Sequence, residues 1–373
     1  MRVGINLLNF SQDRFGGVEQ YVKNLILHLV NVQQDLKLFL FITRPYRDIF
    51  PVHHEQIKRV MFKEVKSPVQ IHEAIHQYQI DLWFSPLHRS YIPDIPIPTV
   101  VTIHDLLHTS YPQYVSDNLE WHNHYYQQFS PSIDSVITVS NFSKQTIIQN
   151  LQIPEEKIHV IYQDAPICFE SELDEGDNVK IKKKYKLPDE YAYYPASYNP
   201  HKNHLNLLKA ILSLRENYNK ELYLVLTGYT YKGNMYFQQV LNFLKEHHLE
   251  KQVMILDYIP QEEMPYLYFH ATFLLFPSLY EGFGIPLVEA MRAQCPIVCS
   301  NRGSIPEIVG EAALQFNPDN TDEIAIQILK AFNPQTRQDL LEKSKERVKT
   351  FSWENSAKET INVFEKVMQR RRK

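Results

Sequence analysis

Short apolar runs alternate with amphipathic stretches along almost the whole chain. This alternation is typical of βαβ units, in which helices connect the strands of a parallel sheet. The first series of runs predicts strands at 3–8, 37–42, 81–84, 99–103, 135–139 and 158–161, and a second series predicts strands at 191–195, 222–227, 253–256, 273–276 and 296–299. The sequence therefore predicts an α/β protein with two parallel sheets and with helices between the strands, notably at 19–32 and 143–150.

A polar segment separates the two series, acidic at its start and rich in lysine at its end. We expect a linker at 166–187 between domains at 1–165 and 188–351, because 373 residues can form two hydrophobic cores. The remaining segment, 352–373, has apolar residues at helical spacing and predicts an amphipathic helix. Its basic end, Arg370-Arg371-Arg372-Lys373, complements the helix dipole or could attract an anionic membrane surface.

Composition argues against several functional classes. A net charge of −4 gives no overall attraction to nucleic acid. No apolar run approaches the roughly 20 residues that span a bilayer, and the first predicted strand begins at Val3, which leaves no room for a signal peptide, so we expect a cytoplasmic protein. Three cysteines cannot build a disulfide framework, and no histidine has carboxylate or cysteine partners at metal-ligand spacing. The sequence also contains no Asp-x-Asp, so we expect no metal.

Two glutamates, Glu281 and Glu289, flank a glycine-rich turn after the predicted strand at 273–276. The glycines allow close approach of a ligand, Pro286 suits the first position of a helix, and the free N–H groups of that helix attract an anion such as a diphosphate. Both glutamates then lie near the carboxyl end of a parallel strand, where open α/β sheets bind ligands. Alternatively, Glu289 complements the helix dipole and Glu281 is a solvated loop residue.

Lys202 and His104 are further candidates. Lys202 follows an Asn-Pro turn and precedes a predicted helix at 203–214, so its ammonium can reach a phosphate. His104 follows the apolar strand at 99–103 and lies at the carboxyl end of its sheet. The alternatives are a solvated lysine, and a histidine satisfied beside a helix cap at Asp105.

Weaker candidates lie in the first half of the chain. Gly16 and Gly17 form a turn whose N–H groups could meet a ligand such as a diphosphate, although most Gly-Gly pairs are ordinary turns. Aromatic residues are dense at 108–129, where packing on the first sheet competes with stacking on a sugar ring or contact with a lipid. Our candidate ligand contacts there are Tyr111, Tyr114 and Trp121.

With these motifs in this order, the chain resembles the retaining glycosyltransferases of family 4 over nearly its whole length. The motifs that carry the resemblance are Gly16-Gly17-Val18-Glu19, Thr102-Ile103-His104-Asp105, Val139-Ser140-Asn141-Phe142-Ser143, Pro200-His201-Lys202-Asn203, 281–291 and 304–310. The resemblance implies the GT-B fold, in which two Rossmann-like domains face each other across a cleft and the last helix crosses back to the first domain. It also implies that the C-terminal half binds most of the donor and the N-terminal half binds the acceptor.

The resemblance also implies roles for individual residues. Glu289 would accept hydrogen bonds from the nucleotide ribose, and Glu281 would hold hydroxyls of the transferred sugar. Backbone N–H groups of Phe283, Gly284 and Ile285 would help to position the sugar and the diphosphate. The histidine of the second motif would contact the sugar or support its reacting centre.

One departure from the family concerns the cations of the donor site. Many relatives have an arginine shortly before, or immediately before, the position of Lys202. The corresponding positions here are Ser197 and His201. A protonated His201, or another residue, would then supply the second phosphate contact.

The resemblance implies a metal-independent, retaining hexosyltransferase that uses a nucleotide-sugar donor and a glycan or lipid-linked saccharide acceptor. The version Pro200-His201-Lys202-Asn203 resembles bacterial polysaccharide enzymes, several of them mannosyl-transferring, so we expect GDP-mannose first and a UDP-hexose second. Two other functions fit the same pattern. One is a catalytically silent GT-B subunit that binds a nucleotide or a partner, and the other is a sugar-nucleotide epimerase, which needs no acceptor.

Overall fold

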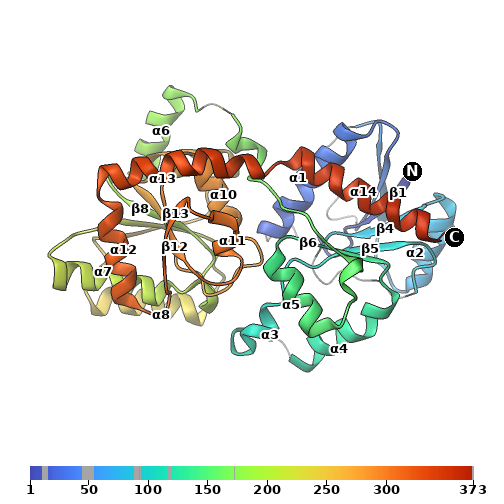
Figure 1. Cartoon of the computed structure of the whole chain (residues 1–373), viewed down its shortest axis with the longest axis horizontal. Coiled ribbons are helices and arrows are strands. Elements are labelled where there is room, and N and C mark those ends of the chain that lie inside the picture. Colours follow the sequence, from blue (N-terminus) through green and yellow to red (C-terminus); the bar gives the residue numbers. More distant parts are fainter. Residues whose placement is uncertain are drawn as a thin grey trace. The chain divides into compact units, whose positions relative to one another are not determined.

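The computed structural model describes residues 1–10, 16–43, 54–87, 92, 94–115, 119–171 and 173–371. The chain forms two compact units, of which unit 1 comprises Met1–Gln163 with Phe351–Lys373 and unit 2 comprises Asp164–Thr350. Each unit contains one parallel sheet with helices packed on it (Figure 1). The predicted α/β class with two parallel sheets is therefore confirmed.

Unit 1 contains a seven-stranded sheet in the order β3-β2-β1-β4-β5-β6-β7. Its strands are β1 (Arg2–Asn6), β2 (Lys37–Thr43), β3 (Ile57–Phe62), β4 (Leu82–Ser85), β5 (Thr99–Thr102), β6 (Ser135–Thr138) and β7 (Ile158–Val160). Its helices are α1 (Gly17–Val32), α2 (Pro68–Gln77), α3 (Leu107–Ser110), α4 (Leu119–Phe129), α5 (Asn141–Leu151) and α14 (Trp353–Arg371). The central strands are buried on both faces, which explains their continuous apolar sequences.

Helix α14 belongs to unit 1, although it follows the whole of unit 2 in the sequence. It packs against α1, where the Trp353 ring lies 6.0 Å from the Tyr21 ring and the side chain of Trp353 is only 1% exposed. The Ser356 hydroxyl donates a hydrogen bond to the Tyr162 carbonyl at 2.5 Å. This bond connects α14 to the last residues of Met1–Gln163, the first of the two segments that form unit 1. Its amphipathic sequence thus has an apolar face covered by α1 and the sheet.

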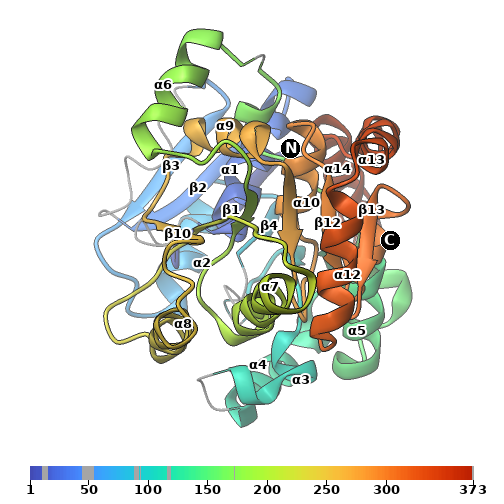
Figure 2. The ribbon, with the colours of Figure 1, turned by 90° about the vertical axis from the view of Figure 1, so that its left-hand side faces the viewer.

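Unit 2 contains a six-stranded sheet in the order β10-β9-β8-β11-β12-β13. Its strands are β8 (Ala192–Pro195), β9 (Leu224–Thr227), β10 (Val253–Leu256), β11 (Phe273–Phe276), β12 (Ile297–Ser300) and β13 (Ala313–Phe316). Its longer helices are α6 (Glu175–Tyr185), α7 (His204–Tyr218), α8 (Met235–Glu246), α9 (Met264–His270), α10 (Ile285–Arg292), α12 (Thr321–Ala331) and α13 (Pro334–Arg347), with a short α11 (Ile305–Val309). Helices α7 and α12 lie side by side on one face of the sheet (Figures 1 and 2).

The segment that we expected to link the two series, 166–187, carries helix α6 and groups with unit 2. Asp174 caps this helix by accepting a hydrogen bond from the Asp177 N–H, and lysines at 182–184 occupy its last turn, where they favour the helix dipole. Its acidic start and basic end are therefore helix-terminus signals. No helix within the described part of the chain is long and apolar enough to cross a membrane.

Candidate functional site

The candidate site of unit 2 lies where the order of its strands reverses. β8 has β9 on one side and β11 on the other, so the segments that leave β8 and β11 begin next to each other at the carboxyl edge of the sheet. Lys202 follows β8 and Glu281 follows β11. Open α/β sheets bind ligands at such a switch point.

Lys202 and Glu281 form an ion pair at this edge. The distance from Lys202 Nζ to Glu281 Oε1 is 2.7 Å, and the two side chains are 18% and 12% exposed. The Leu279 N–H donates to the His201 carbonyl at 2.8 Å, and the Tyr194 hydroxyl donates to the Lys202 carbonyl at 2.7 Å. The two loops are thus joined through their backbones as well as through the charged pair.

The loop after β12 contacts the backbone of the loop that carries Glu281. Ser304 Oγ donates to the carbonyls of Glu281 at 3.0 Å and of Phe283 at 3.1 Å. Gly303 has a φ of +61°, and a Cβ at this position would meet the N and O atoms of Glu281 at 3.1 Å. Only glycine combines this backbone conformation with so close an approach. The carboxylate therefore projects from a loop that is fixed by its neighbours.

Helix α10 begins as the sequence predicts. Gly284, with a φ of +92°, is its N-cap, Ile285 is its first residue and Pro286 lies in its first turn. Phe283 and Ile285 are only 3% and 8% exposed, because their side chains pack into unit 2. A ligand can therefore be met here by backbone N–H groups, and those of the first helical turn point along the helix axis toward the loop.

Glu289 lies one turn into α10 and is half-buried. Tyr268, on α9, donates its hydroxyl to Glu289 Oε2 at 2.5 Å. Burial raises the pKa of Glu289 to about 7, and the hydrogen bond from Tyr268 opposes that rise. Glu289 is thus poised to change charge near neutral pH. Tyr268 was missed by the sequence reasoning, since nothing in its local sequence indicates this contact.

Ser197 and His201 lie in the same segment as Lys202. Ser197 Oγ accepts a hydrogen bond from Asn199 Nδ2 at 2.9 Å, and His201 is half-buried in the short helical turn η6 (Pro200–Lys202). The structure therefore brings all the candidate donor residues of the second half of the chain to the carboxyl edge of one sheet. Among the residues that the structure describes, no group of three or more histidine, cysteine or acidic side chains is arranged to hold a metal ion.

His104 lies in unit 1, after β5, and is 6% exposed. Its Nε2 is 3.1 Å from the Pro86 carbonyl. A carbonyl only accepts, so Nε2 carries the proton, and Nδ1 of the neutral ring is an acceptor. Burial lowers the pKa of His104, against smaller raising effects from the Pro86 carbonyl and Asp105. Asp105 Oδ1 also accepts from the Leu107 N–H at 3.0 Å, which is the helix cap considered above.

Gly16 and Gly17 mark the start of α1 in unit 1, with Gly16 as the N-cap. The Gly16 N–H donates to Glu19 Oε2 at 2.9 Å, so a side chain of the same helix already satisfies it. This leaves the first turn of α1, rather than Gly16 itself, to present N–H groups.

The aromatic segment divides between core and surface. Tyr111 and Tyr114 are half-buried and stack with ring centroids 5.5 Å apart, whereas Tyr126 is buried in a core cluster of unit 1. Trp121 is part of helix α4, but its side chain lies outside the described part of the structure. Packing therefore explains at least part of the aromatic density.

Two families match the chain, one in each half. The family of glycosyl transferases group 1 matches residues 177–349, and glycosyltransferase family 4 matches residues 15–163. The O-antigen chain mannosyltransferase B of Escherichia coli is 31% identical over 295 residues, which are 78% of this chain and 76% of that protein. The serotype-specific mannosyltransferase WbdA of Escherichia coli is 26% identical and covers 74% of this chain, but the match spans only 34% of WbdA.

Solved structures share the fold. Sucrose-phosphate synthase from Thermosynechococcus elongatus has a TM-score of 0.80 at 15% identity and covers 99% of both chains. Anabaena HepE, solved in complex with UDP and glucose, has a TM-score of 0.77 at 16% identity and covers 98% of this chain and 99% of its own. The two matching families, the mannosyltransferase relative and the two Rossmann-like sheets agree: the chain belongs to the glycosyltransferases of family 4 and has the GT-B fold.

Proposed function

We propose that this protein transfers a hexosyl group from a nucleotide sugar to a glycan or lipid-linked saccharide in polysaccharide biosynthesis, with mannose as the first candidate for the transferred sugar. The observation that carries the proposal is the Lys202–Glu281 pair at the strand switch point, with Glu289 on the helix that follows. A cation and a carboxylate at this edge suit a ligand that is anionic at one end and rich in hydroxyl groups at the other. A nucleotide sugar has that chemistry.

Lys202 would stabilise the departing nucleoside diphosphate. Its ammonium has three N–H donors, and Glu281 accepts from one of them at 2.7 Å. The same ammonium can therefore contact a phosphate oxygen, where negative charge develops as the sugar leaves. Glu281 keeps acceptor capacity on its second oxygen for hydroxyls of the transferred sugar.

The first turn of α10 and Glu289 would hold the rest of the donor. Backbone N–H groups of Phe283, Gly284 and Ile285 would bind the diphosphate and the sugar, favoured by the helix dipole. Glu289, when ionised, would accept hydrogen bonds from the ribose hydroxyls. Ser197 and a protonated His201 are our candidates for the second phosphate contact.

Unit 1 would supply the acceptor side. His104 Nδ1 would accept a hydrogen bond from the sugar, and the first turn of α1, which follows the N-cap Gly16 and begins at Gly17, would meet diphosphate or acceptor. Tyr111, Tyr114 and Trp121 would contact the acceptor. We further propose that residues 1–165 form the acceptor domain, 188–351 the donor domain, and 352–373 a helix packed on the acceptor domain.

The first donor to test is GDP-mannose, because the two relatives named above are mannosyltransferases. A UDP-hexose is the second, because a protein of the same fold was solved with UDP and glucose. We propose a metal-free reaction that retains anomeric configuration. The bond from the anomeric carbon to the phosphate oxygen breaks, the acceptor oxygen bonds to the same face, and the leaving phosphate takes the acceptor proton.

The donor is identified by the rise in melting temperature that GDP-mannose, GDP, UDP-glucose and UDP each produce. Product analysis with lipid-linked and soluble saccharides then identifies the acceptor. The proposal expects release of nucleoside diphosphate only when an acceptor is added. Binding without release would support a silent subunit, and release or sugar isomerisation without an acceptor would support an epimerase. An NMR assignment of the product anomer that matches the donor supports retention, and the opposite anomer overturns it.

The basic end of the C-terminal helix α14 is relevant to the location of the protein in the cell. Burial lowers the pKa of His159, and the positive charges of Lys366, Arg370 and Lys144 lower it further, so cations gather near the end of α14. Arg372 and Lys373 lie outside the described residues. We propose a cytoplasmic enzyme with peripheral contact to an anionic membrane. Co-sedimentation with vesicles containing anionic lipid, but not with neutral vesicles, would support this contact, and equal sedimentation would overturn it.

A further inference from the structure

Asn203 joins the turn of Lys202 to helix α7. It follows η6 directly, it is the N-cap of α7, and it has a φ of +61°. Asparagine is one of the few residues besides glycine that adopt this left-handed conformation readily. Its conformation therefore sets the direction in which the chain leaves the Lys202 turn.

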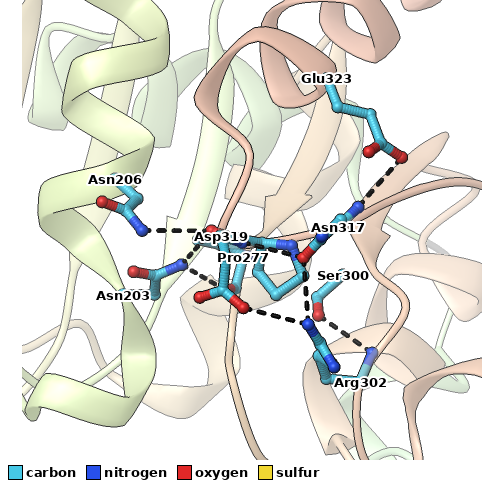
Figure 3. Close-up of polar contacts among 9 residues, drawn as sticks. Asn203, Asn206, Pro277, Ser300, Arg302, Asn317, Asp319 and Glu323 are labelled. Atoms are coloured by element: carbon cyan, nitrogen blue, oxygen red, sulfur yellow. Dashed lines mark hydrogen bonds and ion pairs between the residues drawn. The ribbon is translucent and has the colours of Figure 1, made fainter.

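The side-chain amide of Asn203 connects three loops of the site. Nδ2 donates to the Pro277 carbonyl at 3.2 Å and to the Pro318 carbonyl at 2.9 Å (Figure 3). Pro277 begins the loop that carries Glu281, and Pro318 lies in the loop after β13. Asn203 is only 6% exposed, so water cannot easily replace the amide, and each carbonyl would lose a buried partner without it.

The loop around Pro318 is itself held in place. Arg302 Nη2 donates to Asn317 Oδ1 at 3.2 Å and to Asp319 Oδ2 at 3.0 Å, and the Asn317 N–H donates to Glu323 Oε1 at 3.1 Å (Figure 3). Arg302 precedes Gly303, which packs on the backbone of Glu281. The amide of Asn203 is therefore anchored to the same framework that supports Glu281.

We propose that Asn203 is a positioning residue, which holds the Lys202 turn at a fixed distance from the Glu281 loop so that both side chains meet one donor molecule. The inference rests on the proposed function, in which Lys202 binds the diphosphate and Glu281 binds the sugar. Without the amide, the two loops keep the Lys202–Glu281 ion pair but lose the side-chain bonds that hold both of them to the loop after β13. A misplacement of about 1 Å can cost as much as 100-fold in an active site.

The test uses Asn203→Gly, because glycine keeps the positive φ and removes only the amide. GDP and UDP are each titrated into the protein by calorimetry. We expect Asn203→Gly to weaken binding of the preferred nucleotide about tenfold, and Lys202→Met to weaken it by at least as much. In the double variant, Asn203→Gly should add less than about twofold, because a residue that acts through Lys202 has nothing left to position.

Two matched controls come from the same helix. Asn219 ends α7 with a φ of +46° and is exposed, so Asn219→Gly makes the same substitution in the same conformation away from the site. Asn206 donates Nδ2 to the same Pro318 carbonyl at 3.2 Å but does not bond to Pro277, so Asn206→Ala removes a neighbouring bond only. Both variants should bind nucleotide within about twofold of wild type.

Each result has a definite meaning. Absence of binding to GDP and UDP by the wild-type protein would overturn both the proposed function and this inference. Normal binding by Lys202→Met would overturn the role of Lys202 and the inference with it. If Lys202→Met weakens binding but Asn203→Gly does not, or if their losses add, only the inference fails. If Asn203→Gly does not fold, Asn203→Asp replaces it in the comparison of single and double variants, because aspartate tolerates the same φ but its side chain cannot donate. If neither variant folds, Asn203 is required for folding and the inference fails.

Discussion

Lys202 Nζ donates a hydrogen bond to Glu281 Oε1 at 2.7 Å, although 79 positions separate the two residues in the sequence. The pair forms because β8 and β11 are neighbours in the sheet while their connecting helices diverge to opposite sides of the switch point. Each charge, mostly buried, would be costly alone, and the pairing offsets that cost. The same edge thus places an ammonium and a carboxylate close enough together to bind two parts of one ligand.

Glu281→Gln should lower kcat/KM for sugar transfer about 10- to 100-fold, because a charge-assisted hydrogen bond to a sugar hydroxyl contributes about 1.5–3 kcal/mol. Binding of free GDP or UDP, which lacks the sugar, should change much less. Steady-state kinetics and nucleotide titration measure the two effects. Glu263→Gln is the control, because Glu263 also pairs with a lysine of unit 2, Lys184, at 2.7 Å. Wild-type transfer by Glu281→Gln would contradict the assignment.

The sequence predicted those elements whose signals are local. The runs at 253–256 and 273–276 are strands, and Gly284 and Pro286 open a helix where expected. Two strands were missed, β3 and β13, and both lie at an edge of their sheet. Their side chains are only partly buried, so they lack the continuous apolar run that identifies a central strand.

The contacts that complete the site could not be predicted, because they join residues far apart in the sequence. The motif Pro200-His201-Lys202-Asn203 indicated a phosphate-binding lysine, but nothing in it shows that Asn203 reaches Pro318. The Tyr268–Glu289 hydrogen bond likewise depends on how α9 packs beside α10. A local sequence motif predicts which residues lie at the carboxyl edge of the sheet. Which of these residues contact one another depends on how the helices and loops pack in the folded chain.

Glu289 should make donor binding dependent on pH. Its pKa is about 7, and ribose hydroxyls bind best to the ionised form. Affinity should therefore rise about tenfold from pH 6 to pH 8 and level off above the pKa. Calorimetry with GDP-mannose or UDP-glucose measures this dependence without interference, because their phosphates do not titrate in this range.

Glu289→Gln is the control for this dependence, and it should bind the donor more weakly with an affinity that no longer rises with pH. A phosphate contact from protonated His201 would act in the opposite sense and strengthen binding as the pH falls. A wild-type affinity that increases toward pH 6 would therefore contradict the role of Glu289 and favour His201. Because the two dependences cancel when both residues act, a flat wild-type profile would contradict both roles only together with a flat profile of Glu289→Gln.

Gly303→Ala should damage transfer by moving the Glu281 loop. Its φ of +61° costs alanine about 1–2 kcal/mol, and the new Cβ would press on the backbone of Glu281. We expect a lower melting temperature and at least a tenfold loss of kcat/KM. Gly233→Ala is the control, because Gly233 also has a positive φ, +90°, but no atom lies within 4 Å of its Cβ position. It should lose stability while keeping transfer, and equal loss of transfer in both variants would contradict the proposed contact.

His204 should weaken the protein in acid. It is buried among the rings of Tyr194, Tyr198 and Tyr236, and burial, reinforced by the charge of Lys202, lowers its pKa to about 3. Below pH 6.5 the unfolded chain therefore takes up a proton that the folded chain does not, and about 2 kcal/mol of stability is lost between pH 7 and pH 5. Because the raised pKa of Glu289 acts in the opposite sense over the same range, the effect must be measured as the difference between wild type and His204→Phe in urea unfolding. That variant keeps an aromatic ring and should gain about 2 kcal/mol of stability relative to wild type on going from pH 7 to pH 5. A difference that does not change with pH would show that His204 takes up a proton as readily in the folded protein as in the unfolded chain, which would contradict the lowered pKa.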